Sequence, residues 1–250
     1  MITTIALERR MVQVDLSKPL DISIPLRGDV SNVNAWYVEH PKIAPHTVGD
    51  YTGKVSLGAS TNFNDVWFNP HAHGTHTECL GHITKAFHSV NHHLKQFFYD
   101  AVLITITPAP YGEDLVIAKA QVEQALDGRS YSALVIRTLP NGPEKLGKQY
   151  SHTNPPYLQA DAASFMVSRG IDHLLVDLPS VDREQDKGQL LAHKAFWQMG
   201  GDVRYHATIT ELVYVPESIP DGEYLLNLQM APFENDASPS RPVLYKMKTP

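Results

Sequence analysis

In the middle of the chain, short apolar runs alternate with segments in which apolar residues recur at helical spacing. Short apolar, β-branched runs at 101–107 (A-V-L-I-T-I-T), 133–137 (A-L-V-I-R) and 173–178 (H-L-L-V-D-L) predict buried strands. Between these runs, apolar residues at helical spacing predict amphipathic helices over 117–126 and 160–169, each followed closely by a glycine. Two consecutive strand–helix–strand patterns indicate an α/β fold in which part of the sheet is buried on both faces.

Outside this central region the pattern is less regular. The segment 12–26 alternates β-branched and polar residues around prolines, which predicts two extended pieces. The segment 28–53 shows no clear period and is predicted as a long loop, followed by extended chain over 55–70. The remaining predictions are a short helix over 190–197, strands over 205–215 and 224–230, and an edge strand over 242–247.

The composition is that of an ordinary soluble globular protein. Hydrophobic residues make up 42% and charged residues 19% of the 250 positions, so the chain can bury a substantial core. A single layered domain over 1–250, with a mixed β-sheet and flanking helices, is the simplest organisation that accounts for these elements.

Charge and cysteine content exclude several classes of partner. The net charge is −6 and no cluster of Lys and Arg is visible, which argues against a nucleic-acid partner. Cys79 is the only cysteine, so an intrachain disulfide is excluded. Charged residues at 8–10 interrupt the apolar run that a secretory signal would need, and no stretch approaches the roughly 20 apolar residues of a membrane span. We therefore expect a cytoplasmic protein without a membrane partner.

The candidate chemistry lies in one segment, His71 to His82, which reads H-A-H-G-T-H-T-E-C-L-G-H. It holds four of the chain's 13 histidines together with one carboxylate, Glu78. Imidazole and carboxylate ligands together suit a divalent ion such as zinc or manganese, whereas burying them without a metal would be costly. The segment therefore predicts a metal site.

The spacing within this segment indicates which side chains meet. In an extended segment His76 and Glu78 lie two residues apart and project from one face, as metal ligands on a strand must. His71 and His73 have the opposite parity. A β-bulge at Gly74 would switch the face and bring His71 round to join His76, so His71 is favoured over His73 as a ligand.

The segment also resembles a known family. G-T-H-T-E-C-L-G-H is similar to the signature H-x-G-T-H-x-D-x-P-x-H of the metal-dependent cyclase-like hydrolases, which include bacterial kynurenine formamidase and isatin hydrolase. Further stretches resemble the same family in the same order, so that the likeness covers most of the chain: D-I-S-I-P-L at 21–26, A-L-V-I-R-T at 133–138, G-I-D-H-L-L-V-D-L-P-S-V-D at 170–182, L-L-A-H-K-A-F at 190–196, I-T-E-L at 209–212 and D-G-E-Y-L-L at 221–226.

By position, the resemblance implies that His76, Glu78, His193 and Glu211 are metal ligands and that His82 is the catalytic acid/base. It also implies a swivelling β/β/α architecture, one or two zinc or manganese ions, and a homodimer or larger homo-oligomer. His206 is an alternative to His193, although in a regular strand it would face away from Glu211.

The chain departs from the family signature at three positions. The first histidine of the signature falls on Ala72, so His71 would have to substitute for it through a local shift of the backbone. The aspartate of the signature is Glu78, which is one methylene longer, and the proline is Leu80.

The activity implied by the resemblance is hydrolysis of a linear or cyclic amide, such as an aryl formamide. A divalent ion lowers the pKa of bound water from about 15.7 towards 7 and polarises a carbonyl. His82 would then pass a proton to the leaving amine. Trp36 is equally consistent with a substrate-binding wall and with packing. Two alternatives remain: a non-catalytic relative that binds a small molecule, and a thiol enzyme that uses Cys79.

Overall fold

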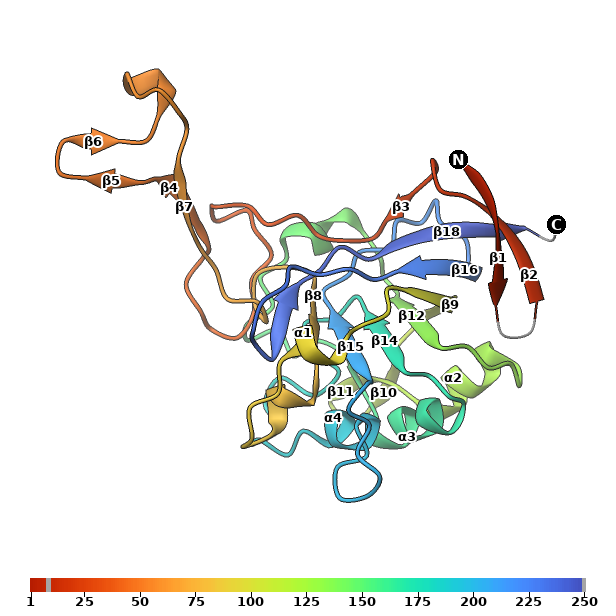
Figure 1. Ribbon diagram of the computed structural model, residues 1–250. Helices are drawn as coiled ribbons and strands as arrows, with labels where there is room; N and C mark the ends of the chain where they lie inside the picture. Colours follow the sequence, from red (N-terminus) through yellow and green to blue (C-terminus); the bar gives the residue numbers. More distant parts are fainter. Residues whose placement is uncertain (8–9, 249–250) are drawn as a thin grey trace.

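Four parallel strands form the centre of the molecule in the computed structural model, which describes residues 1–7 and 10–248 (Figure 1). They lie side by side in chain order, and the connections between them carry three helices. The strands are β9 (Phe98–Ile106), β12 (Ala133–Thr138), β14 (His173–Val176) and β15 (Thr208–Glu211), and the helices are α2 (Lys119–Leu126), α3 (Ala160–Ser168) and α4 (Leu191–Phe196). The predicted strand–helix–strand units are confirmed, although β15 is shorter than the predicted 205–215.

Antiparallel strands extend this core on both sides into a mixed sheet of 11 strands within the described residues. Beyond β9 lie β16 (Gly222–Asn227), β18 (Val243–Lys248), β2 (Arg10–Asp15) and β1 (Ile2–Leu7), while β3 (Leu20–Asp21) pairs with β18. Beyond β15 lie β8 (His76–Glu78) and β17 (Ala237–Pro239). The strand predicted over 242–247 is confirmed as β18, but its predicted edge position is wrong, because the N-terminal hairpin β1–β2 pairs with the outer side of β18.

The two faces of the sheet are buried in separate clusters. Along β9, Val102 and Ile104 pack on the face that α2, α3 and α4 cover, whereas Ala101 and Leu103 pack on the other face. This alternation follows from the two-residue period of a strand. The predicted mixed α/β layered architecture is thus confirmed.

Helix α2 shows how local sequence fixes one of these layers. Val122 and Leu126 lie one turn apart and are both fully buried against the sheet. The Gln121 side chain accepts a hydrogen bond from the amide of Ala118 (3.0 Å) and so satisfies one free donor at the start of the helix. The helix ends where Asp127 adopts a left-handed conformation.

Residues 42–67 form an arm that projects from the body of the molecule (Figure 1). It consists of the paired strands β4 (Lys42–Pro45) and β7 (Asn64–Trp67), the short hairpin β5 (Thr47–Val48) and β6 (Tyr51–Thr52), and a 3₁₀ turn over Val55–Leu57. The predicted long loop over 28–53 is thus partly wrong, as is continuous extended chain over 55–70. Large apolar side chains stay exposed on the arm, among them Val48, Leu57 and Phe63.

The remaining elements are small. A second sheet contains β10 (Ala109–Tyr111), β11 (Asp114–Ile117) and β13 (Tyr157–Leu158), and a single helical turn, α1, covers Val90–His93. Across residues 1–7 and 10–248, no helix has both the length and the apolar character that crossing a membrane requires. In parallel sheets, functional groups gather where the strands end, and the segments after β14 and at the end of β15 meet β8 at this edge.

Candidate metal centre

The histidine-rich segment begins as a turn and continues as the strand β8. The amide of His71 donates to Asn69 Oδ1 (2.9 Å) and the amide of Ala72 donates to the Asn69 carbonyl (3.2 Å), so the chain reverses here. The turn carries His71 back over β8, where its ring centroid lies 5.2 Å from that of His76. The bulge predicted at Gly74 is therefore wrong, because β8 begins only at His76 and a turn brings His71 to the site.

Strand β8 presents two candidate ligands on one face. His76 and Glu78 both reach the site, whereas Thr77 between them bonds Thr210 on the opposite face, with 2.8 Å between the two Oγ1 atoms. His76 also pairs in register with Glu211 of β15. Backbone pairing of β8 and β15 thus brings the distal candidate Glu211 next to the histidine segment.

Glu78 lies at the centre of the site and is fully buried. Its Oε1 lies 3.0 Å from His193 Nε2, and its Oε2 lies 3.2 Å from His71 Nδ1 and 3.9 Å from His82 Nδ1. Among the described residues, three sets of side chains place their ligand atoms within 4.8 Å of one another. Two of them contain Glu78, one with His71 and His76 and the other with His82 and His193, and the third consists of His71, His82 and Asp236. The arrangement can accommodate one ion, or two ions that share Glu78.

His193 is held by a carboxylate that sequence reasoning gave no role. Asp182 accepts hydrogen bonds from His193 Nδ1 (2.6 Å) and from the amides of Ala192 (2.7 Å) and His193 (3.2 Å) in the first turn of α4. Because an ionised carboxylate only accepts, Nδ1 carries a proton and Nε2 faces Glu78. A carboxylate behind a histidine in this way is the usual support of a metal-binding imidazole.

Glu211 and His76 face each other across the site. Glu211 Oε1 accepts from the amide of Val181 (2.9 Å), and its Oε2 lies 3.4 Å from His76 Nε2. His76 Nδ1 donates to the carbonyl of Gly74 (3.0 Å), so Nε2 presents a lone pair to Glu211. Among the described residues, His76 Nε2 and Glu78 Oε2 are buried polar atoms without a hydrogen-bond partner. A bound cation would satisfy both atoms, so these residues fit a divalent metal.

The electrostatics of the site favour positive charge around Glu78. Burial lowers the pKa of His71, but the nearby carboxylates of Asp236 and Glu78 outweigh it and raise this pKa to about 10. Burial likewise opposes protonation of His193, but Asp182 and Glu78 raise its pKa to about 10. Burial raises the pKa of Glu78, but His82, His193 and His71 together hold it well below its usual range. In the absence of a metal, protons on imidazoles compensate the buried carboxylates.

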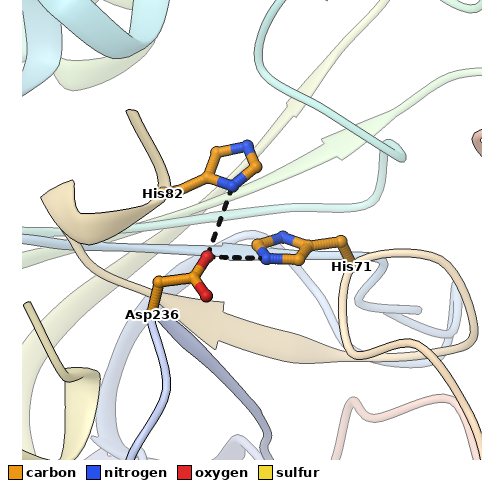
Figure 2. A group of neighbouring side chains, drawn as sticks. All are labelled: His71, His82 and Asp236. Carbon is orange, nitrogen blue, oxygen red and sulfur yellow. Dashed lines mark hydrogen bonds and ion pairs between the residues drawn. The ribbon is translucent and has the colours of Figure 1, made fainter. Parts of the chain in front are cut away.

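His82 lies at the outer side of the site, in a short 3₁₀ turn after β8. Its side chain is 32% exposed, whereas that of His193 is 2% exposed. Its ring stacks on that of His71 with centroids 4.3 Å apart. Figure 2 shows that Asp236 lies against both rings, with its Oδ2 at 2.9 Å from His71 Nε2 and 3.4 Å from His82 Nδ1.

The two alternative ligands and the alternative nucleophile do not join the candidate metal ligands. His73 is buried elsewhere: its Nδ1 accepts from the amide of Asn69 (2.8 Å) and its ring lies beside Trp67. His206 is exposed and pairs with Asp172 at 3.1 Å. Cys79 is fully buried, and burial raises the pKa of its thiol to about 11, which leaves little thiolate at neutral pH.

Trp36 is the predicted substrate-binding residue. It is partly buried and packs against a cluster of apolar side chains that includes Ile24, Val33 and Leu212, the residue after Glu211. The contacts described for Trp36 are packing contacts.

Sequence reasoning missed the two supporting carboxylates, Asp182 and Asp236. Asp182 carried a usable signal, because it is the last residue of the family-like stretch over 170–182. Asp236 carried none. It lies in the irregular segment E-N-D-A-S-P, and only the pairing of β17 with β8 brings it to the histidines.

Comparison with known proteins shows relatives in sequence and in fold. Over 90 residues the chain is 36% identical to the kynurenine formamidase of Bacillus cereus, an alignment that covers 36% of the chain and 39% of that relative's length. The kynurenine formamidase of Bacillus cytotoxicus is 28% identical over 233 residues, which cover 91% of the chain and 97% of the relative. Isatin hydrolase A from Ralstonia solanacearum has a similar fold, with a TM-score of 0.66 and 16% identity over 91% of each chain.

The family assignment rests on a longer match. Residues 14–183 match the family described as putative cyclase. This region contains the whole histidine segment, β8 and the carboxylate Asp182. The match covers more than half of the chain, which therefore belongs to the putative cyclase family.

Proposed function

We propose that the protein is a metal-dependent hydrolase of a linear or cyclic amide bond, in particular of an aryl formamide. The observation that carries this proposal is the pair of facing acceptors, His76 Nε2 and Glu211 Oε2, beside the fully buried Glu78. A divalent cation between its members would satisfy both atoms. The relatives named kynurenine formamidase support an amide substrate.

The candidate ligands of a zinc or manganese ion are His71, His76, Glu78, His193 and Glu211. When bound, such an ion would activate water and polarise the carbonyl of the substrate. The protein supplies the geometry: Asp182 holds His193, the Gly74 carbonyl holds His76, and the Val181 amide holds Glu211. Each of these three ligands is therefore oriented before the ion arrives.

We assign the acid/base role to His82. It is the most exposed imidazole of the cluster, so it can exchange protons with solvent and substrate. An imidazole titrates near neutral pH and can take a proton from water and pass it to a leaving amine. The other histidines are more enclosed. Trp36 is the candidate wall of the substrate site.

The proposal is tested by metal analysis combined with turnover. Bound metal would be measured on the purified protein, and hydrolysis of formamides, lactams and esters would be measured before and after chelation. We expect stoichiometric zinc or manganese, amide hydrolysis that chelation abolishes, and loss of turnover with retained metal in His82→Ala. Retained metal without turnover of any amide would favour a binding protein on the same scaffold, and absence of metal at every pH would refute the metal site.

A further inference from the structure

One carboxylate oxygen of Asp236 contacts both His71 and His82. Asp236 Oδ2 lies 2.9 Å from His71 Nε2 and 3.4 Å from His82 Nδ1 (Figure 2). The two rings are stacked, with 30° between their planes. Asp236 thus links a candidate ligand to the candidate acid/base.

The contacts of the His71 ring indicate which of its two nitrogens carries a proton when the ring is neutral. The contact between Nε2 and Asp236 has hydrogen-bond geometry. Nδ1 lies 3.2 Å from Glu78 Oε2, yet that oxygen receives no hydrogen bond from any described residue. In the neutral ring that a metal ligand requires, the proton therefore lies on Nε2 and the lone pair of Nδ1 faces Glu78.

The backbone fixes Asp236 in place. Its carbonyl accepts from the amide of Cys79 (3.0 Å), and the preceding carbonyl of Asn235 accepts from the amide of Val90 (2.8 Å). The next residue, Ala237, pairs with Glu78 in the β17–β8 ladder. Glu78 and Asp236 therefore enter the site from adjacent, hydrogen-bonded strands, and the side chain of Asp236 is only 25% exposed.

We propose that Asp236 is a positioning residue that sets the tautomers of both rings. It holds the proton of His71 on Nε2, which leaves Nδ1 for the metal, and it holds the proton of His82 on Nδ1, which leaves Nε2 for proton transfer. Asp236 supports His71 in the way that Asp182 supports His193. This inference rests on the proposed function, because it gives His82 the orientation that an acid/base needs.

The same three side chains could instead hold a cation of their own, since their ligand atoms lie within 4.8 Å of one another. In that case His71 would turn its lone pair to Asp236 and donate from Nδ1 to Glu78. The hydrogen-bond geometry at Asp236 and the unsatisfied Glu78 oxygen favour the positioning role. The experiment below separates the two.

The test compares Asp236→Asn with the wild type and with a matched control, Glu234→Gln. Glu234 lies two residues earlier, but it pairs with Asn91 and His92 at the surface, so its neutralisation should leave the site unchanged. Two-bond ¹H–¹⁵N NMR spectra of the zinc-loaded proteins report which ring nitrogen of each histidine carries the proton. A competing chelator gives metal affinity, and amide hydrolysis gives kcat and KM separately.

For Asp236→Asn we expect mixed tautomers of His71 and His82, metal affinity weakened about 10–100-fold, and a fall in kcat larger than the change in KM. Wild-type tautomers in Asp236→Asn would overturn the inference, as would the loss of one whole ion per chain. If Asp236→Asn does not fold, Asp236→Glu takes its place, with a shifted carboxylate and the same criteria.

The outcome for Asp236 is distinguishable from the outcome for the proposed function. Altered tautomers in a protein that hydrolyses no amide would uphold the positioning role and refute the proposed function. An active wild type whose tautomers, affinity and kcat survive Asp236→Asn would uphold the function and refute the positioning role.

Discussion

Replacing Asp182 by asparagine tests the link between helix α4 and the metal site. In Asp182→Asn, the side-chain carbonyl oxygen can still accept from the amide of Ala192, which Asp182 now binds at 2.7 Å. The new amide group would face His193 Nδ1, where Asp182 Oδ2 now lies at 2.6 Å. An amide donor in this position requires a lone pair on Nδ1, which moves the ring proton to Nε2, the nitrogen that faces Glu78.

The magnitude follows from these contacts. Loss of a carboxylate behind a metal-binding histidine weakens metal affinity about 10–100-fold, which corresponds to about 1.4–2.7 kcal/mol. Asn keeps an oxygen that accepts from the amide of Ala192, whereas Ala removes this hydrogen bond, which costs about 0.5–1.5 kcal/mol of folding stability. We therefore expect Asp182→Asn and Asp182→Ala to share the loss of metal affinity, and Asp182→Ala alone to lose the additional stability of this hydrogen bond.

The assay is a zinc titration against a chromophoric chelator, together with urea unfolding of each protein at saturating zinc. Unchanged metal affinity in Asp182→Asn would refute the assignment of His193 Nε2 as a ligand. Equal metal affinity in the wild type and Asp182→Ala would refute the supporting role of the carboxylate altogether.

Four further predictions follow from the site and the arm. The pKa values of His71 and His193 are raised from 6.5 to about 10 in the folded, metal-free protein. Their contribution to folding stability is therefore complete below pH 6.5 and is lost as the pH rises through 10. A melting temperature of the metal-free protein that stays level from pH 6.5 to 10 would contradict this. Metal binding displaces the same protons, so apparent zinc affinity should rise with pH over that interval, as measured by competition titration. Iodoacetamide should leave Cys79 unmodified and activity intact in the folded protein, because the thiol is buried and its pKa is raised to about 11; inactivation by alkylation would instead favour a thiol enzyme. The exposed apolar side chains of the arm over residues 42–67 agree with a homodimer or larger assembly, and a monomeric mass by light scattering would contradict it.

The sequence predicts the central fold well because its signals are local. The runs over 101–107 and 133–137 carry their β-branched pattern within a few residues, and each lies within an observed strand or overlaps it closely. The arm could not be predicted in this way. Its strands are two to four residues long, and pairing between β4 and β7 joins positions as far apart in the chain as Lys42 and Trp67.

The candidate site was also predictable only where local sequence decides the position of a residue. The two-residue period places His76 and Glu78 together, and the structure has them on one face of β8. The position of His71 depends on a turn that Asn69 closes with its side chain, and this turn was not expected. Asp236 reaches the site only through a pairing between β17 and β8, which no local pattern encodes.

The position of β8 has a consequence for the synthesis of the chain. β8 contributes His76 and Glu78 early in the chain, but its neighbours β15 and β17 come from residues 208–211 and 237–239. Contacts between such distant segments form late in folding, because a long loop must close first. A nascent chain that has emerged only as far as α4 would therefore hold its histidines without Glu211 and Asp236. Metal loading should accordingly wait until residues 208–239 have emerged from the ribosome.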